Sequence, residues 1–342
     1  MKKALITGIT GQDGYFLSQF LLSKGYEVSG LARRNSQQSL GSLEYLPAET
    51  KKQIRIYWGD IIDCFFVEKI IKEGQFNEIY HLAAQSFVHL SFTNPKLTYD
   101  VDIGGTPNVV NAIKEHSPRS KLYFAATSEL FGKANEYPQN ENTPFYPRSP
   151  YGVSKLAGFW TIKNYRESYN LFMSNGILFN HESEIRGPEF VTRKITLGVA
   201  RIYYGLQEHL ELGNLDARRD WGYAKDYVEG MWKILQHKKP DDFVLATGED
   251  HSIREFVEES FRVIGKEIVW EGTGIKEIGR DRKTGNILIK VNPEYFRPAE
   301  VEHLIGSPSK AKKELNWKPR TKFKDLVKLM VESDLKRAKE SL

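Results

Sequence analysis

Residues 7–14 read Thr-Gly-Ile-Thr-Gly-Gln-Asp-Gly, directly after the apolar run Ala4-Leu5-Ile6 and before Tyr15-Phe16-Leu17. The pattern predicts a strand that turns abruptly into a helix across three glycines. Gly8 would allow the tight turn, Gly11 the approach of a dinucleotide pyrophosphate, and Gly14 close helix packing, while the helix N-terminus offers unpaired N–H groups. Glycine-rich turns can also serve strand-to-helix geometry alone, so the residues that follow must decide.

Composition narrows the class of protein. The 342 residues are 40% hydrophobic and 27% charged, which is ordinary for a globular enzyme, and the length suggests two lobes. The net charge is +5, but the Lys and Arg residues are scattered among 44 acidic residues, so no nucleic-acid partner is expected. No apolar run approaches the roughly 18 residues of a membrane span. Cys64 is the only cysteine, which excludes an intramolecular disulfide and favours the cytoplasm.

Short apolar runs alternate with helical patterns in the first half of the chain. Strands are expected at Lys3–Thr7, Glu27–Ala32, Ile54–Trp58, Glu78–Ala83, Lys121–Ala126, Phe172–Phe179 and Phe243–Ala246, and helices at Tyr151–Ser168, Arg201–Leu206, Tyr223–Leu235, Ile253–Ile264 and Lys324–Lys339. A charged stretch, Glu182–Thr192, suggests a ligand-facing loop. The predicted fold is α/β, a Rossmann-like doubly wound parallel sheet with a smaller, interleaved α/β substrate-binding lobe. Residues 1–180, with a returning segment at 216–248, would form the cofactor domain, and residues 181–215 and 249–342 the second lobe.

The end of the second predicted strand indicates the cofactor. NAD sites usually place an acidic residue there, on the ribose 2′-hydroxyl. This chain instead has Arg33, Arg34, Asn35 and Ser36, which suit a 2′-phosphate, so NADP is expected in preference to NAD. An exposed basic loop remains an alternative for one of the arginines.

Two further strand ends offer cofactor contacts. Asp60, beside Ile61, could accept a hydrogen bond from adenine, although it or Asp63 could equally cap a helix. After the fourth strand, the small and polar residues Leu82, Ala83, Ala84, Gln85 and Ser86 leave space for a flat nicotinamide riboside. His81 and His89 are expected to be structural, and no metal site is predicted because no carboxylate or cysteine stands at ligand spacing.

The chemical centre is predicted at Tyr151 and Lys155. They are four residues apart on a predicted helix and so share one face. An ammonium near the phenol would lower the phenol pKa from about 10, making a general base for a sugar or alcohol hydroxyl. A Tyr-x-x-x-Lys pair alone is often coincidental, but here it follows the glycine turn and a fifth strand.

At this point the chain resembles the nucleotide-sugar enzymes of the extended short-chain dehydrogenase/reductase family. The fifth strand ends in Thr127, Ser128 and Glu129, and this acidic residue is similar to that of the GDP-mannose 4,6-dehydratases. Blocks at 179–183, 190–195, 212–216, 219–222 and 295–302 carry the same resemblance. It implies that Tyr151 takes the O4 proton while C4 is oxidised, and that Glu129 removes the C5 proton and protonates the departing C6 hydroxyl, with Thr127 near O4 and Ser128 near O6 or Glu129.

The resemblance also implies two sets of binding residues. Cofactor contacts would come from Gly8, Thr10, Gly11, Gln12, Asp13, Gly14, Tyr151, Lys155, His181 and Arg186, in addition to those at the strand ends. A GDP-sugar, with GDP-mannose as first choice, would contact Ser86, Asn180, Val191, Lys194, Arg219, Arg297 and Glu300. The loop Arg33–Ser42 would reach a neighbouring subunit, so a homodimer or homotetramer is expected.

Three departures from the family pattern concern the sugar more than the reaction. Glu184-Ile185 replaces a Pro-Arg pair, Leu97 replaces a tyrosine, and Pro107 stands where proline is unusual. The alternatives are a dehydratase of another GDP-sugar, such as a GDP-heptose, and a nucleotide-sugar 4-reductase or epimerase. A non-catalytic regulator would be expected to lack Tyr151, Lys155 or Glu129, and all three are present.

Overall fold

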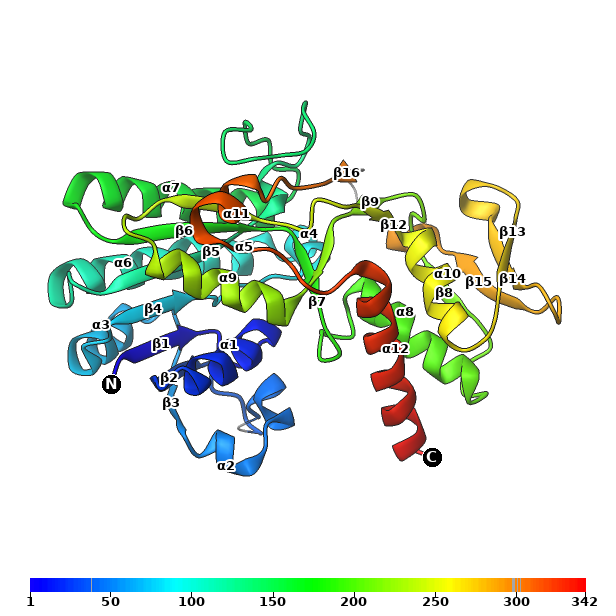
Figure 1. The fold of residues 1–342 in the computed structure, drawn as a ribbon, viewed down its shortest axis with the longest axis horizontal. Helices are drawn as coiled ribbons and strands as arrows, with labels where there is room; N and C mark the ends of the chain where they lie inside the picture. The colour runs from blue at the N-terminus through cyan, green and yellow to red at the C-terminus, as the bar shows by residue number, and fades with distance from the viewer. Residues whose placement is uncertain (38, 297–298, 300, 302) are drawn as a thin grey trace.

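A parallel sheet of seven strands forms the centre of the molecule (Figure 1). The computed structural model describes residues 1–37, 39–296, 299, 301 and 303–342. The sheet has the order β11-β6-β5-β4-β1-β2-β3. Its strands are β1 (Lys3–Thr7), β2 (Glu27–Ala32), β3 (Ile54–Trp58), β4 (Glu78–His81), β5 (Lys121–Thr127), β6 (Met173–Leu178) and β11 (Asp242–Leu245). The order reverses at β1, which pairs with both β2 and β4, so a crevice is expected at the carboxyl ends of these strands.

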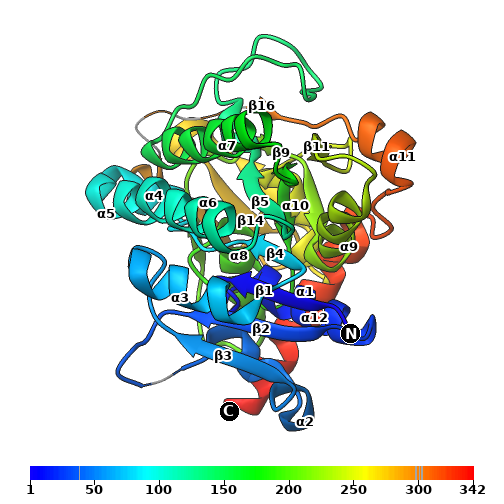
Figure 2. The same cartoon turned by 90° about the vertical axis from the view of Figure 1, so that its left-hand side faces the viewer.

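Helices cover both faces of this sheet (Figure 2). One face carries α1 (Gln12–Ser23) and α9 (Ala224–Gln236), and the other carries α3 (Cys64–Gly74), α6 (Gly105–His116) and α7 (Pro150–Tyr169). Side chains of β1 alternate between the layers: Ala4 and Ile6 join the first core, and Leu5 the second. The predicted doubly wound fold is therefore confirmed, because such strands need helices on both sides.

Several short helical elements lie between the longer ones. They are α2 (Ala48–Lys51), α4 (Val88–Thr93), α5 (Pro95–Tyr99), α11 (Ser309–Leu315), the 3₁₀ turns η1 (Gly41–Tyr45), η3 (Ser128–Leu130), η4 (Gly274–Lys276) and η5 (Pro293–Tyr295), and the π-helical η2 (Asp100–Gly104). Pro107 lies in the first turn of α6, directly after η2. Since proline lacks an N–H, the changed hydrogen-bond register of a π turn at this point accommodates it without ending the helix.

The rest of the chain packs beyond the carboxyl edge of the sheet (Figure 1). It contains α8 (Val191–Tyr203), α10 (Ile253–Val263) and α12 (Phe323–Glu340), whose apolar faces continue the core of α1 and α9. Three small sheets join them, ordered β10-β7, β12-β9-β16 and β13-β14-β15-β8. Their strands are β7 (Asn180–Glu182), β8 (Leu210–Leu212), β9 (Arg218–Arg219), β10 (Trp221–Tyr223), β12 (His251–Ser252), β13 (Ile268–Glu271), β14 (Ile278–Asp281), β15 (Ile287–Val291) and β16 (His303–Leu304).

The helix predicted at Arg201–Leu206 is wrong in its position. Helix α8 begins at Val191, inside the stretch predicted as a loop, and ends at Tyr203. Its buried face includes Thr192 and Arg193, whose polar groups are paired by carboxylates from β7 and α12. A search for apolar periodicity does not detect a buried helix face that contains polar residues. The predicted lobe boundaries at residues 180, 215 and 248 stay a prediction.

Among the described residues no helix combines the length and apolar content needed to cross a membrane.

Candidate active site

The glycine turn closes tightly against the neighbouring strand. Gly8 has a φ of 71°, and a Cβ there would lie 2.8 Å from the Ala83 backbone. A Cβ on Gly14 would lie 2.2 Å from the Ile9 carbonyl oxygen. At Gly11 it would meet only the Gly8 carbonyl oxygen at 3.5 Å, an ordinary contact, so protein packing does not require glycine there. Close approach of a pyrophosphate to the first amides of α1 does require it, and the turn therefore fits a dinucleotide.

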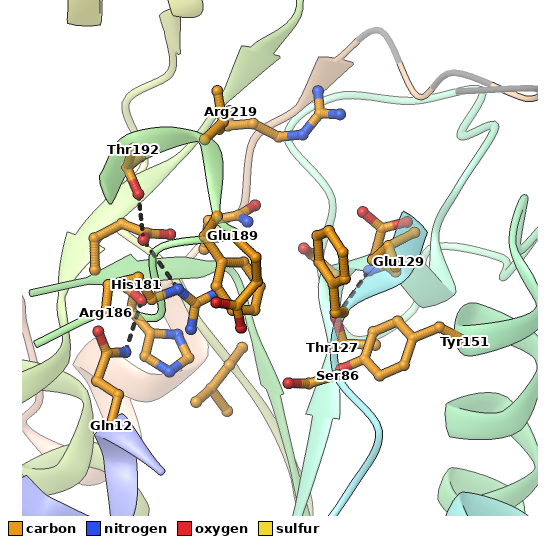
Figure 3. Close-up of a pocket in the computed structure, with 18 of the residues that line it drawn as sticks. Gln12, Ser86, Thr127, Glu129, Tyr151, His181, Arg186, Glu189, Thr192 and Arg219 are labelled. Atoms are coloured by element: carbon orange, nitrogen blue, oxygen red, sulfur yellow. Dashed lines mark hydrogen bonds and ion pairs between the residues drawn. The ribbon is translucent and has the colours of Figure 1, made fainter. Parts of the chain in front are cut away.

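A cavity of about 660 Å³ opens beside this turn, a volume typical of small-molecule sites (Figure 3). Most of the predicted site residues line it. They are Gly8, Gly11, Gln12, Asp13, Gly14, Leu82, Ala84, Ser86, Thr127, Ser128, Glu129, Tyr151, Lys155, Asn180, His181, Arg186, Val191, Lys194 and Arg219. The structure thus brings together residues from the ends of β1, β4, β5 and β7 and from α7, α8 and β9.

One wall of the cavity carries Thr127, Glu129 and Tyr151. Thr127 ends β5, and its hydroxyl accepts a hydrogen bond from the Glu129 amide at 3.2 Å. Helix α7 begins next to it because the Ser149 hydroxyl caps the Gly152 amide at 3.0 Å. A Cβ on Gly152 would lie 2.9 Å from the Glu129 carbonyl oxygen, so glycine lets the helix start pack against this turn. The Tyr151 phenol consequently reaches a hydrogen bond with Thr127.

The electrostatics of Tyr151 differ from the prediction. Burial raises the pKa of its phenol, the carboxylates of Asp102 and Glu129 add to that effect, and the Thr127 hydrogen bond and the Arg186 charge only partly oppose it. The net shift is therefore upward, where the sequence analysis expected Lys155 to lower the phenol pKa. The Lys155 ammonium donates to the Ala125 carbonyl oxygen at 2.8 Å, and burial lowers the pKa of Lys155.

Asp102 is a buried carboxylate beside the site that the sequence analysis did not single out. It is 4% exposed and accepts hydrogen bonds from the Gln85 amide and the Ser154 hydroxyl, each at 2.8 Å. Burial raises the pKa of this carboxyl, and the nearby Lys155 charge lowers it only in part. Asp102 therefore ties the loop after β4 to α7, one turn from Tyr151. Asp102 lies in the π-helical η2. Such turns often mark functional sites, but the sequence pattern does not reveal them.

The opposite wall carries Arg186 (Figure 3). Its guanidinium lies 3.1 Å from the buried Glu182 carboxylate and 3.5 Å from the Phe190 ring centroid. Glu182 also accepts the Thr192 hydroxyl at 2.6 Å. Glu182, Phe190, Glu189 and His89 line the cavity as well. None of them was predicted as a site residue, and His89 was expected to be structural. The charge of the 182–192 stretch is a signal for the first three.

His181 links this wall to the glycine turn. Its Nδ1 lies 2.8 Å from the Phe179 carbonyl oxygen and its Nε2 lies 2.8 Å from the Asp13 carboxylate. Both partners only accept hydrogen bonds, so both ring nitrogens donate and the imidazole is cationic. Burial opposes this charge, but the charge of Asp13 and its hydrogen bond outweigh burial and raise the pKa of His181. Gln12 adds a second link, through the His181 carbonyl and the Ser183 hydroxyl.

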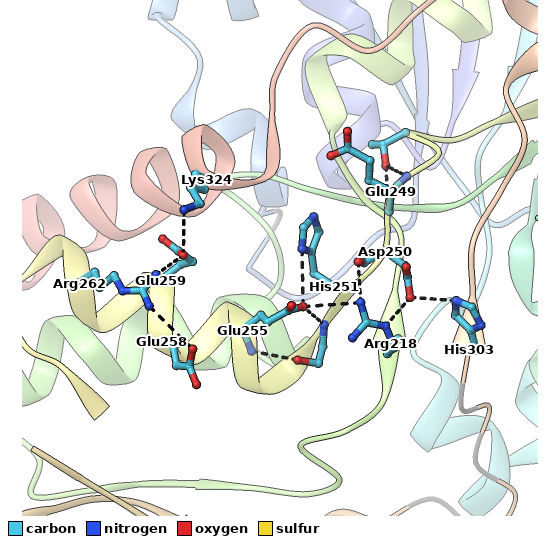
Figure 4. Close-up of polar contacts among 12 residues, drawn as sticks. Arg218, Glu249, Asp250, His251, Glu255, Glu258, Glu259, Arg262, His303 and Lys324 are labelled. Atoms are coloured by element: carbon cyan, nitrogen blue, oxygen red, sulfur yellow. Dashed lines mark hydrogen bonds and ion pairs between the residues drawn. The ribbon is translucent and has the colours of Figure 1, made fainter. Parts of the chain in front are cut away.

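The cavity lining also includes two cationic side chains and one buried polar atom without a hydrogen-bond partner among the described residues. The Lys194 ammonium lies 3.4 Å from the Tyr295 ring centroid. Arg219 is buried on β9, next to Arg218, which is held by Asp250 at 2.6 Å, while His303 of β16 also contacts Asp250 at 2.8 Å (Figure 4). The buried Asn180 Oδ1 has no hydrogen-bond partner among the described residues. Arg297 and Glu300, also predicted here, lie outside the described residues.

The remaining predicted cofactor residues lie outside the cavity lining. They are Thr10, Arg33, Arg34, Asn35, Ser36, Asp60, Ile61, Ala83 and Gln85. Arg33 to Ser36 are exposed directly after β2, at the same edge of the sheet. Asp63, not Asp60, caps α3, through a hydrogen bond from the Phe66 amide at 3.1 Å. The Gln85 side chain bonds to the Phe87 carbonyl and Thr98 and so shapes its own loop.

His81 is a buried histidine between two hydroxyl groups. Those of Thr7 and Thr106 lie 2.8 and 3.2 Å from its ring nitrogens, and burial lowers its pKa to about 3. It is therefore a neutral structural residue, as predicted. Within the described ranges, His, Cys, Asp and Glu side chains form no group of three or more that could hold a metal ion.

The fold and the site together define an enzyme of the extended short-chain dehydrogenase/reductase class. Residues 5–330 match the family described as GDP-mannose 4,6 dehydratase. The chain is 54% identical over 340 residues to GDP-mannose 4,6 dehydratase of Cricetulus griseus, covering 98% of this chain and 91% of that protein. It is 48% identical over 357 residues to the Yersinia enterocolitica GDP-mannose 4,6-dehydratase, covering 99% and 95%. The chain belongs to the GDP-mannose 4,6-dehydratase family, a family of hydro-lyases.

The fold is also similar to solved structures of related enzymes. The crystal structure of the Thermus thermophilus UDP-glucose 4-epimerase in complex with NAD aligns with a TM-score of 0.80 and 25% identity, covering 97% of this chain and 98% of that one. The similarity covers the sheet and the smaller elements alike, so the architecture is common to enzymes of different reactions. The reaction must therefore be argued from the residues of the site.

Proposed function

We propose that this protein dehydrates a GDP-hexose, first of all GDP-mannose, to the 4-keto-6-deoxy sugar nucleotide, with NADP as cofactor. Glu129 carries the proposal. It lies in the same cavity as Thr127 and Tyr151, directly after the strand end, where an oxidoreductase that only moves hydrogen at C4 needs no carboxylate. Family membership adds support from the whole length of the chain.

The cofactor fits the edge formed by β1, β2 and β4. The glycine turn and the first amides of α1 would take the pyrophosphate, and Arg33 and Arg34 the 2′-phosphate, since no carboxylate follows β2 before Glu44. A bound cofactor would supply hydride chemistry, with a hydride accepted from C4 of the sugar and returned to C6, so there would be no net oxidation. His181 and Arg186, both at the cavity wall, would face the nicotinamide ring.

Tyr151 and Glu129 would move the protons. The Tyr151 oxygen, hydrogen-bonded to Thr127, is placed to take the O4 proton, and the bound cofactor and substrate would have to offset the burial that now raises its pKa. Once C4 is a ketone, the C5 proton is acidic. Glu129 would remove it and protonate the departing C6 hydroxyl, so that this proton leaves with the water. The proton that Tyr151 took from O4 would balance the one that C5 receives when C6 is reduced.

The GDP moiety would occupy the far end of the cavity. Lys194 and Arg219 supply positive charge for the diphosphate, and the Asn180 amide offers a polar contact to the substrate. On this basis residues 1–180 with 216–248 would serve the cofactor, and residues 181–215 with 249–342 the GDP-sugar.

We also expect a cytoplasmic homodimer or homotetramer. Light scattering at micromolar concentration would test the oligomeric state, and a purely monomeric protein would count against it.

A dehydratase of another GDP-sugar is the second candidate. Where the family pattern has an arginine beside the active site, Ile185 is buried in the core, and Glu189 lines the cavity. Loss of this cation would change which hydroxyl groups of the sugar are accepted.

A panel of GDP-sugars tests both candidates. The purified protein is incubated with NADP and GDP-mannose, GDP-heptose or GDP-glucose, and the products are read by mass spectrometry for loss of one water. We expect water loss from GDP-mannose. Water loss from another GDP-sugar alone would transfer the function to the second candidate, and a product of unchanged mass with altered C4 stereochemistry would indicate an epimerase.

A further inference from the structure

Helix α12 carries a buried carboxylate that the reaction does not use. Asp334 is fully buried and accepts hydrogen bonds from the Arg193 Nε, at 3.0 and 2.9 Å to its two oxygens, and from the Thr196 hydroxyl at 2.7 Å. The Arg193 Nη2 lies 2.8 Å away. A buried ion pair rarely stabilises a fold more than apolar side chains of the same volume would, so this pair calls for a second explanation.

The explanation lies at the other ends of the arginines. Arg193 donates from Nη1 to the Arg186 carbonyl oxygen at 2.8 Å. Arg337, one turn beyond Asp334 on α12, lies 3.3 Å from the same carboxylate and donates to the Glu184 carbonyl oxygen. One carboxylate thus orients two guanidiniums, and each of these holds a carbonyl on one side of Ile185, which is buried in the core.

The segment held in this way has little regular structure of its own. Between the end of β7 at Glu182 and the start of α8 at Val191 the backbone–backbone hydrogen bonds are those of turns, such as that from the Arg186 amide to the Ser183 carbonyl at 3.1 Å. Yet this segment presents the Arg186 side chain to the cavity, on the wall opposite Tyr151 (Figure 3). A side chain on an irregular segment keeps its place only if the backbone is fixed from outside.

The same helix also reaches the proposed cofactor loop. The Arg337 guanidinium lies 4.9 Å from the Tyr45 ring centroid, and Tyr45 ends η1, shortly after the basic residues that follow β2. Arg337 therefore contacts both the segment that carries Arg186 and the turn behind the loop.

We propose that Asp334 is a positioning residue of the active site, which fixes the Glu184–Arg186 backbone through Arg193 and Arg337 and so keeps the Arg186 guanidinium at the cavity. The kinetic part of this inference rests on the proposed dehydratase function. The structural part does not, because it concerns only how the backbone is held.

Kinetics of a double-mutant cycle test the first part. Asp334→Asn should lower kcat for water loss from GDP-mannose about tenfold or more, because small displacements at a reaction centre are costly. KM should rise less, since Lys194 and Arg219 are held by other contacts. In an Arg186→Met background, the same substitution should lower kcat by less than about twofold, because the side chain that it positions is gone. An equal fold-loss in both backgrounds would mean that Asp334 supports the fold generally and would overturn the proposal.

Hydrogen exchange of the backbone tests the second part without any assay. Peptides covering residues 183–190 should exchange faster in Asp334→Asn than in the unmodified protein, while peptides covering residues 8–14 should not change. Arg337→Met, at a partly exposed position, gives the same test if Asp334→Asn does not fold. Asp325→Asn, exposed on the same helix, is the matched control and should change neither exchange nor kcat. Unchanged exchange at 183–190 in both variants would refute the inference, whereas an unmodified protein that releases no water would refute only the proposed function.

Discussion

The two walls of the cavity are built in different ways. The wall with Thr127, Glu129 and Tyr151 consists of a strand end, a single turn and the first turn of a helix, so regular elements hold its backbone. The wall with Arg186 is an irregular segment, held by Glu182 from β7 and by Arg193 and Arg337, the last of which comes 153 residues after its acceptor Glu184. The backbone of the first wall is fixed by secondary structure, and that of the second by side chains from distant parts of the chain.

This difference separates activity from stability. Side chains of the first wall can be changed without disturbing what holds them, because the backbone there is fixed by strand pairing and helix capping. Side chains of the second wall are themselves part of the support. Substitutions there should lower both activity and stability, and the following variants test this contrast.

The largest expected effect is on the first wall. Tyr151→Phe should lower the rate about 10²- to 10⁴-fold because the O4 proton loses its base. Glu129→Gln should lower product formation by a similar factor but still permit oxidation at C4, so absorbance in the nicotinamide band should rise without 6-deoxy product. Stopped-flow absorbance and mass spectrometry would measure both.

Two outcomes would break this part of the comparison. A Glu129→Gln variant with a turnover close to that of the unmodified protein would make Glu129 a bystander and the dehydratase assignment untenable. A loss of more than about 1 kcal/mol in unfolding free energy for either variant would show that the first wall is supported by its own side chains.

On the second wall, Glu182→Gln should cost stability as well as rate. Glu182 is 2% exposed and pairs with Arg186 and Thr192, so its removal leaves a largely buried guanidinium without its counter-ion. We expect a loss of about 2–4 kcal/mol in unfolding free energy, measured by urea denaturation. Glu211→Gln, at a partly exposed carboxylate, is the control. A stable Glu182→Gln variant would remove the distinction between the walls.

The exposed loop after β2 should affect only cofactor choice. Arg34→Asp replaces a phosphate contact by a repulsion, so the Kd for NADP should rise about 10- to 100-fold, with that for NAD changing much less. Fluorescence titration measures both Kd values. Arg119→Asp is the control, because Arg119 is exposed just before β5, at the amino-terminal edge of the sheet. Equal affinities of the unmodified protein for the two cofactors would contradict the NADP assignment.

The smallest effect concerns the His181–Asp13 pair, which joins the second wall to the glycine turn. The folded pKa of His181 is raised, so its contribution is present below about pH 6.5 and lost as the pH rises through the folded value. Burial opposes ionisation of Asp13, but His181 outweighs it and lowers the pKa, so that contribution is present above about pH 3.9 and lost as the pH falls through the folded value.

The pair therefore stabilises most between about pH 4 and 6.5. His181→Gln should lose about 1–2 kcal/mol there and progressively less toward pH 9, as measured by urea denaturation across this range. A difference from the unmodified protein that does not vary with pH would show that the pair carries no net charge interaction.

Most of the fold and the first wall could be predicted from the sequence. Strands β1, β2 and β3 have the predicted bounds, and the spacing of Tyr151 and Lys155 placed both residues on one face of α7. The protonation of Tyr151 could not be predicted, because Lys155 turns to the Ala125 carbonyl and the buried Asp102 lies nearby. Helix α8 was misplaced because its buried face is partly polar.

The sequence by itself determined the strand-turn-helix at residues 3–23, the alternation of strands and helices, and the strand end and helix start that carry Thr127, Glu129 and Tyr151, because short-range periodicity and glycine placement act between neighbours in the chain. Only the tertiary structure decided where Arg186 stands and which charges surround it. Its supports come from β7, α8 and α12, and a buried charge is satisfied by whichever partner the fold brings within reach, a distance that sequence spacing does not record.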